Sequence, residues 1–245
     1  MSNKRYWQLD LLKGVGVLLM IGWHFSFDLV NLVRTTDYFG YWYWRIGPEV
    51  ISGIFLFSSG IGTYLRSVRV KTNDSYFPVS FKFGWHVGAR IFFVGILLSL
   101  ITRFGTQDYI IFFGILHLIG FCILVSPLFV GLPKKLLFSL ALILLIGGYI
   151  FESSVYYSEF KFWLQVIFFK RVMLDFYLPL PSLGYFLLGI AFAPDLLRYF
   201  SKDTKMINVK WMSFLGKHSL IVYLVHQPLL IGILYLFGFQ IRGPG

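Results

Sequence analysis

Charged residues are scarce in this sequence. Only 13% of the 245 residues are charged, whereas 57% are hydrophobic. A soluble domain carries about 25% charged residues, because it must cover its core with polar surface. This chain has too little polar surface for that purpose. The composition therefore excludes an ordinary soluble domain and predicts a membrane protein, whose outer surface contacts lipid.

Cysteine pairs and cofactor motifs are also lacking. The single cysteine, Cys122, lies in an apolar run, so no disulfide forms within the chain. The five histidines include no His-x-x-x-His pair, which gives no reason to expect a metal site. No Walker loop or dinucleotide fingerprint is present. The longest predicted loop, from Ser67 to Trp85, is too short for a soluble domain, so any chemistry must occur in the helix bundle or at its mouths.

What the sequence does contain is a series of long apolar segments. A membrane-spanning helix needs about 20 mostly apolar residues. The sequence predicts an all-α bundle of about seven spans that forms a single transmembrane domain over residues 1–245, with spans at 9–33, 48–66, 86–103, 110–130, 134–152, 181–199 and 217–238. The apolar stretch 160–169 is too short to span and is predicted to be interfacial or re-entrant, and 208–214 is predicted to lie along the surface.

Basic residues indicate the orientation of these spans. Most of the 22 Lys and Arg residues fall in the predicted loops on the side of the N-terminus, which places that end in the cytoplasm. The expected location is the plasma membrane of a prokaryote. The net charge of +11 is explained by cytoplasmic loops that meet anionic lipid, and no nucleic-acid partner is expected. A polyanionic ligand such as a nucleotide or coenzyme A is the alternative explanation.

A histidine and an aspartate share one face of the first span. His24 and Asp28 are separated by four residues, which is about one helical turn. A carboxylate beside an imidazole can hold its tautomer and raise its basicity, as a general base requires. A packing pair that satisfies itself is the structural alternative.

Two further histidines lie within predicted spans. His117 has few polar neighbours in sequence, so its partner must come from another helix, or it bonds a backbone carbonyl. It is predicted in the outer half of its span, at a depth similar to that of His24. His226 precedes Gln227 and Pro228, and Pro228 frees a backbone carbonyl near residue 224 that either side chain could satisfy. A catalytic and a structural role are both open for His226.

Other polar residues are expected near the membrane boundaries. Glu49 and Asp175 are predicted on the outer side, where they line a mouth or are solvated loop charges. The run from Tyr41 to Trp44 is typical of a membrane interface. Gly84 and Gly88 form a GxxxG pair, which indicates close helix packing.

Four sequence motifs, in order, resemble one family. They are the segment from Arg5 through Leu9-Asp-Leu-Leu-Lys-Gly14 to His24, the segment Gly53–Gly60, the segment Phe113-Gly-Ile-Leu-His117, and the segment from Ser219 to Pro228. Together they resemble the heparan-alpha-glucosaminide N-acetyltransferase-like transmembrane acyltransferases, in a short prokaryotic form. Two departures are evident. The lysosomal members have asparagine at the position of His24 and a catalytic histidine in the next loop, whereas this chain has no histidine between His24 and His86.

The resemblance implies transfer of an acetyl group from cytoplasmic acetyl-CoA to an extracytoplasmic acceptor, such as an amino sugar or another glycan. It makes His24, Asp28 and His117 the candidate catalytic residues, with His226, Gln227, Glu49 and Asp175 in support. The residues expected to bind the coenzyme A phosphates are basic and lie near the cytoplasmic side: Lys13, Arg66, Arg69, Lys82 and Arg90. A small transporter or flippase and a non-catalytic assembly protein are the competing functions, and a homo-oligomer stays open.

Overall fold

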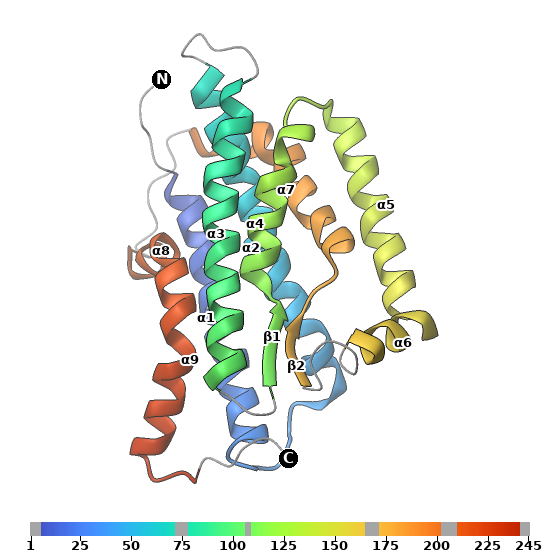
Figure 1. The fold of residues 1–245 in the computed structure, drawn as a ribbon. Helices are drawn as coiled ribbons and strands as arrows, with labels where there is room; N and C mark the ends of the chain where they lie inside the picture. The colour runs from blue at the N-terminus through green and yellow to red at the C-terminus, as the bar shows by residue number, and fades with distance from the viewer. Residues whose placement is uncertain (1–5, 72–77, 106–108, 165–171, 202–209, 241–245) are drawn as a thin grey trace. The chain divides into compact units, whose positions relative to one another are not determined.

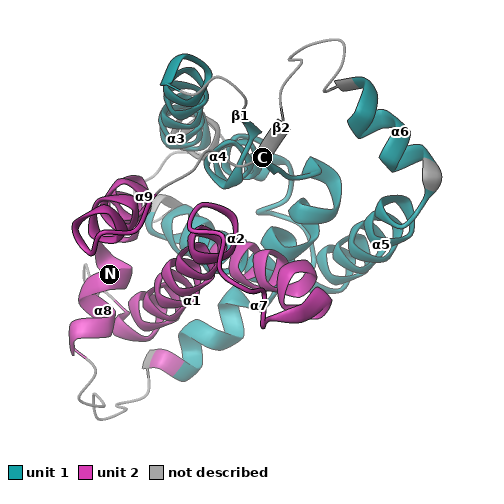
Figure 2. Ribbon diagram, turned by 90° about the horizontal axis from the view of Figure 1, so that it is seen from below, with its two compact units in different colours: residues 1, 56–199 teal, residues 2–55, 200–245 magenta. Residues whose placement is uncertain are grey.

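The structure is a computed structural model that describes residues 6–71, 78–105, 109–164, 172–201 and 210–240 (Figure 1). The chain divides into two compact units (Figure 2). One unit comprises residues 2–55 and 200–245, and the other comprises residue 1 and residues 56–199. We call them the terminal unit and the central unit.

The described residues are overwhelmingly helical. Long apolar segments form helices because a helix satisfies its backbone hydrogen bonds internally, which the interior of a bilayer requires. In chain order the elements are α1 Trp7–Asn31, α2 Gly40–Lys71, α3 Pro78–Gly105, β1 Tyr109–Phe113, α4 Ile115–Val125, the 3-10 turn η1 Ser126–Leu128, α5 Lys134–Glu152, α6 Val155–Leu164, β2 Val172–Phe176, α7 Pro179–Ser201, α8 Lys210–Lys217 and α9 Ser219–Leu236 (Figure 1).

Six helices among the described residues are long and apolar enough to cross a membrane. They are Trp7–Asn31, Gly40–Arg69, Gly84–Gly105, Lys134–Glu152, Pro179–Phe200 and Ser219–Leu236. These correspond to six of the predicted spans. The largest difference is in α2, which begins at Gly40, well before the predicted residue 48, and contains Pro48. The prediction of an all-α membrane helix bundle is confirmed.

The predicted span 110–130 differs from the structure. Its first residues form the strand β1, which pairs in parallel with β2. Only Ile115–Leu128 is helical, and it is shorter than a membrane-spanning helix. The strand is favoured because β-branched and aromatic residues suit an extended chain. Its backbone is also satisfied from outside the segment, since Ile111 N–H donates to the hydroxyl oxygen of Thr102 at 3.2 Å.

In the terminal unit, glycines bring α1 and α8 into backbone contact. A Cβ atom at Gly14 would lie 2.1 Å from the carbonyl oxygen of Met212, and one at Gly216 would lie 1.7 Å from that of Asp10. No larger residue fits at either position. The helix Lys210–Lys217 covers most of the segment that was predicted to lie along the surface, and residues 208 and 209 lie outside the described part of the chain.

In the central unit, glycines likewise bring two further helix pairs into close contact. Gly84 and Gly88 of α3 pack against α4, where Cβ atoms would lie 3.1 Å from the Ile123 carbonyl oxygen and 2.8 Å from Leu124. The prediction of close packing at this GxxxG pair is confirmed. Gly60 of α2 packs against α7, and a Cβ atom there would lie 2.2 Å from the carbonyl oxygen of Phe186.

The first turn of α4 meets a carboxylate from β2. Ile115 N–H donates to Asp175 Oδ2 at 3.4 Å, and Gly114 allows this approach because a Cβ atom there would lie 2.6 Å from the same oxygen. Asp175 lies outside the six candidate spans. Burial raises its pKa from 3.8 to about 7, and the hydrogen bond from Ile115 opposes the rise. Asp175 is thus partly enclosed and hydrogen-bonded to α4, which favours a structural or functional role over a solvated loop charge.

Gly60→Ala tests the contact between α2 and α7. We expect it to lower the free energy of unfolding by about 2 kcal/mol, because the new methyl group overlaps a backbone oxygen that cannot move aside. Gly62→Ala is the matched control on the same helix, since no atom lies within 4 Å of its Cβ position. Thermal unfolding in detergent measures both. Equal stability of the two variants would contradict the packing described for Gly60.

The titration of Asp175 gives the stability a defined pH dependence. Between pH 4 and 7 the unfolded chain, with the ordinary pKa of 3.8, has released a proton that the folded chain still holds at a pKa of about 7. Stability therefore falls as pH rises through this range and levels off above it. We expect Asp175→Asn to remove this component. The free energy of unfolding of the variant, measured relative to that of the native chain, should therefore be higher at pH 8 than at pH 4. Melting curves across that range measure it, with Glu49→Gln as the control for loss of one carboxylate. Parallel curves for the native chain and Asp175→Asn would contradict the assignment.

Candidate functional site

His24 is held on α1 by a carbonyl of its own helix. Its Nδ1 lies 2.9 Å from the carbonyl oxygen of Met20, one turn earlier. A carbonyl oxygen only accepts hydrogen bonds, so Nδ1 carries the hydrogen in this contact. In the neutral ring Nε2 then retains its lone pair, and it is the nitrogen that can take up a proton.

His226 repeats this arrangement on α9. Its Nδ1 lies 2.6 Å from the carbonyl oxygen of Tyr223, close to the carbonyl that Pro228 was predicted to free. The two imidazole rings meet edge to face, with centroids 4.7 Å apart and planes at 80°. The first and last helices of the chain thus place two imidazoles against each other, each with Nδ1 bonded to its own backbone.

Asp28 is bonded to Gln227 rather than to His24. Its carboxylate is fully buried, at 0% exposure, and Oδ1 accepts a hydrogen bond from Gln227 Nε2 at 2.8 Å. The prediction that Asp28 holds the tautomer of His24 is therefore wrong. The reason is that the Met20 carbonyl already occupies Nδ1, and Gln227 reaches the carboxylate from the facing helix.

We call the side chains of His24, Asp28, His226 and Gln227 the histidine cluster. Three of its buried acceptors make no hydrogen bond within the described part of the chain. They are Asp28 Oδ2, Gln227 Oε1 and His226 Nε2. Buried polar atoms without a partner are rare, and each calls for an explanation. A ligand that carries several N–H or O–H donors would satisfy them, as an amine or a sugar does.

Tyr43 and Trp23 also belong to this site, although neither is among the predicted site residues. The Tyr43 hydroxyl donates to Ser26 Oγ at 3.0 Å, and Ser26 Oγ donates to the carbonyl oxygen of Gly22 at 2.9 Å. Trp23 packs edge to face on His24, with centroids 5.2 Å apart. Tyr43 was hidden in an aromatic run that resembles an ordinary interface belt, whereas the position of Trp23 beside His24 was a usable signal.

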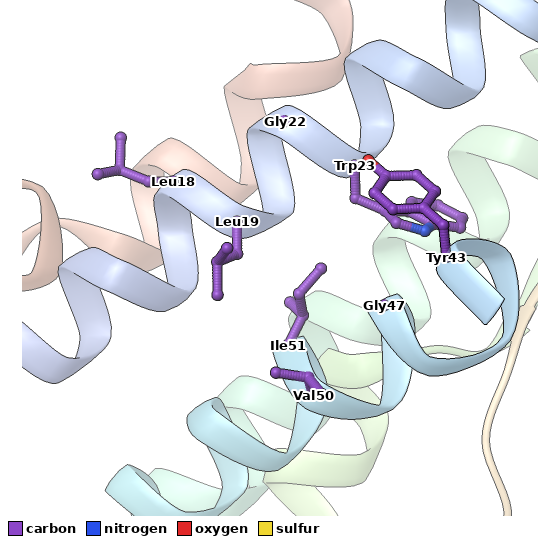
Figure 3. A pocket seen from close by; sticks show the side chains of 8 residues that line it. All are labelled: Leu18, Leu19, Gly22, Trp23, Tyr43, Gly47, Val50 and Ile51. Carbon is purple, nitrogen blue, oxygen red and sulfur yellow. The ribbon is translucent and has the colours of Figure 1, made fainter. Parts of the chain in front are cut away.

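A pocket of about 320 Å³ lies between α1 and the first half of α2 (Figure 3). Trp23 and Tyr43 stand at one end of it, and aliphatic side chains of both helices line the rest (Figure 3). Because Trp23 contacts both the pocket and His24, the pocket adjoins the histidine cluster.

His117 belongs to the central unit and is surrounded by aromatic rings. It is 4% exposed, stacks on Phe113 and meets Phe92 edge to face, with centroid distances of 5.5 Å and 5.2 Å. Ser99 Oγ lies 3.5 Å from Nε2, which is long for a hydrogen bond. A Cβ atom at Gly95 would lie 2.9 Å from Nδ1, so α3 also closes on the ring. His117 Nδ1 also makes no hydrogen bond within the described residues, but the rings and α3 enclose it closely, which favours a packing role for His117.

The remaining predicted residues belong to different units. Glu49 forms an exposed ion pair with Arg45 at 3.7 Å, which fits a solvated charge. Lys13 belongs to the terminal unit, whereas Arg66, Arg69 and Arg90 belong to the central unit. The side chain of Lys82 lies outside the described residues. Among the described side chains, no group of three His, Cys, Asp or Glu residues is placed to hold a metal ion.

Comparison with known proteins identifies the family. No curated protein and no solved structure matches the chain. A family model described as "Heparan-alpha-glucosaminide N-acetyltransferase, catalytic" matches residues 5–228, which cover both the histidine cluster and His117. With its apolar helices and this match, the chain is an integral membrane protein that belongs to the heparan-alpha-glucosaminide N-acetyltransferase catalytic family, and it is a membrane acyltransferase of that family's type.

Proposed function

We propose that the protein transfers an acetyl group from acetyl-CoA to an amino sugar or another glycan, and that His24 is the base. The observation that carries this proposal is the pair of imidazoles on α1 and α9. Both have Nδ1 bonded to a backbone carbonyl, which leaves each Nε2 able to accept a proton. A base within reach of the attacking group is what acyl transfer requires.

The reaction needs one proton to move. The amine or hydroxyl of the acceptor attacks the carbonyl carbon of the thioester, so that a new C–N or C–O bond forms. The C–S bond then breaks, and coenzyme A leaves as a thiolate. His24 Nε2 takes the proton from the attacking group and passes it to the thiolate sulfur, which yields free coenzyme A and regenerates the neutral imidazole.

The other polar groups of the cluster would position the acceptor. Asp28 Oδ2, Gln227 Oε1 and His226 Nε2 are acceptors that lack a partner among the described residues. The hydroxyl and amino hydrogens of a sugar supply the donors that these three atoms require. Asp28 and His226 are therefore proposed as positioning residues, and Gln227 links the two helices.

The donor would approach from the cytoplasmic side. Lys13, Arg66, Arg69, Lys82 and Arg90 are the basic residues proposed to meet the coenzyme A phosphates, because arginine pairs with phosphate through its planar fork. The bias of basic residues toward the N-terminal side supports a cytoplasmic N-terminus in the plasma membrane of a prokaryote.

Histidine variants test the proposal. We expect His24→Asn to lower kcat about 10²–10⁴-fold, the range for loss of a general base. His117→Asn should instead lower the melting temperature and leave kcat nearly unchanged, because that ring is packed among Phe92, Phe113 and Gly95. Transfer of labelled acetyl groups to glucosamine measures the rate, and the exposed His86 supplies the control His86→Asn. Full activity of a folded His24→Asn protein would overturn the proposal.

A further inference from the structure

The pocket between α1 and α2 has the apolar lining of a site for a hydrocarbon chain. Leu19 of α1 faces Val50 and Ile51 of α2 across it (Figure 3). Leu19 is 45% exposed and Val50 is 47% exposed, so the pocket opens at the surface. In a membrane helix bundle such a surface meets lipid, and an apolar chain is the group that fills it without loss of hydrogen bonds.

One of the residues that line this pocket, Trp23, carries an unused hydrogen-bond donor. Trp23 Nε1 is buried and makes no hydrogen bond within the described residues. Gly47 leaves it room, since a Cβ atom at that position would lie 2.8 Å from Nε1. The neighbouring Tyr43 hydroxyl already donates its hydrogen to Ser26 Oγ. A ligand that fits beside Trp23 therefore carries a hydrogen-bond acceptor, such as a glycosidic, ester or phosphate oxygen, at the head of its hydrocarbon chain.

The pocket and the histidine cluster are joined through Trp23. This side chain lines the pocket and contacts the ring of His24, with centroids 5.2 Å apart. A free sugar has no apolar part to place along Leu19 and Val50. A molecule with a hydrocarbon tail in the pocket, an acceptor oxygen at Trp23 Nε1 and a sugar as its head would extend that sugar past Trp23 toward His24.

We propose that the acceptor is a lipid-linked sugar, whose hydrocarbon chain binds in the pocket between α1 and α2. This inference rests on the proposed function and names the class of its acceptor. The pocket selects the acceptor by its tail, and the histidine cluster acts on its sugar.

Gly22 allows the pocket to be filled without disturbing the helix. It lines the pocket, and no atom lies within 4 Å of its Cβ position, so the side chain of Gly22→Leu has room to extend into the cavity. Gly232→Leu is the matched control in the same unit, because Gly232 of α9 is exposed and its Cβ position is equally open.

The kinetic test uses protein in nanodiscs and two acceptors, glucosamine and dodecyl glucosaminide. We expect the alkyl chain to lower KM at least about tenfold in the native protein and in Gly232→Leu, because its methylene groups leave water for an apolar site. Gly22→Leu should lose this advantage and keep the native KM for free glucosamine. An equal advantage of the alkyl chain in all three proteins would overturn the inference, since it would then reflect partition into the membrane.

Photolabelling separates this inference from the proposed function. A dodecyl glucosaminide with a diazirine in its chain should label the pocket segments of α1 and α2 in the native protein and in Gly232→Leu, but not in Gly22→Leu. Labelling without any acetyl transfer would reject the proposed function and leave the site intact. Transfer without labelling there, or equal labelling by a diazirine phospholipid that carries no sugar, would reject the lipid-linked acceptor.

Discussion

The hydrogen bond between Asp28 and Gln227 is the interaction on which the candidate site depends. It joins side chains 199 residues apart in sequence and ties the first helix of the terminal unit to the last. A carboxylate buried among apolar helices is costly unless hydrogen bonds compensate it, so α1 and α9 are stable together only in the register that places Gln227 against Asp28. That register also brings His226, one residue before Gln227, onto the ring of His24.

The two histidines owe their chemistry to helix geometry. Each Nδ1 bonds a carbonyl three or four residues earlier on its own helix, which fixes both the tautomer and the direction of the ring. The site therefore needs no carboxylate to orient its base. Asp28 is left free to meet a ligand through Oδ2, and the surplus of acceptors over donors suits a substrate rich in hydroxyl and amino groups. Trp23 separates this polar cluster from the apolar pocket, so a single helix presents one surface for a sugar and another for a hydrocarbon chain.

The sequence predicted those features that depend on local pattern. Hydropathy located six long helices, and a histidine within an apolar run singled out both His24 and His226 as functional candidates. Prediction from the sequence failed for contacts between elements that are distant along the chain. The spacing of His24 and Asp28 suggested a pair, but Gln227 competes for the carboxylate from a distant segment that spacing cannot reveal. The strand β1 looked like the start of a helix because its partner, β2, lies some sixty residues later. His117 appeared as exceptional as His24, and only its packing against Phe92, Phe113 and Gly95 distinguishes the two.

The proposed chemistry requires that His24 and His226 are held as neutral rings with hydrogen on Nδ1 and a lone pair on Nε2. Nitrogen-15 chemical shifts of histidine-labelled protein measure this directly, with the two rings assigned from the His24→Asn and His226→Asn variants. Near neutral pH we expect Nδ1 of both rings to be protonated and both Nε2 atoms to be unprotonated. We also expect an amino-sugar acceptor to shift the Nε2 signals toward hydrogen-bonded values. Rings with hydrogen on Nε2, or Nε2 signals that do not respond to any acceptor, would contradict the proposed chemistry.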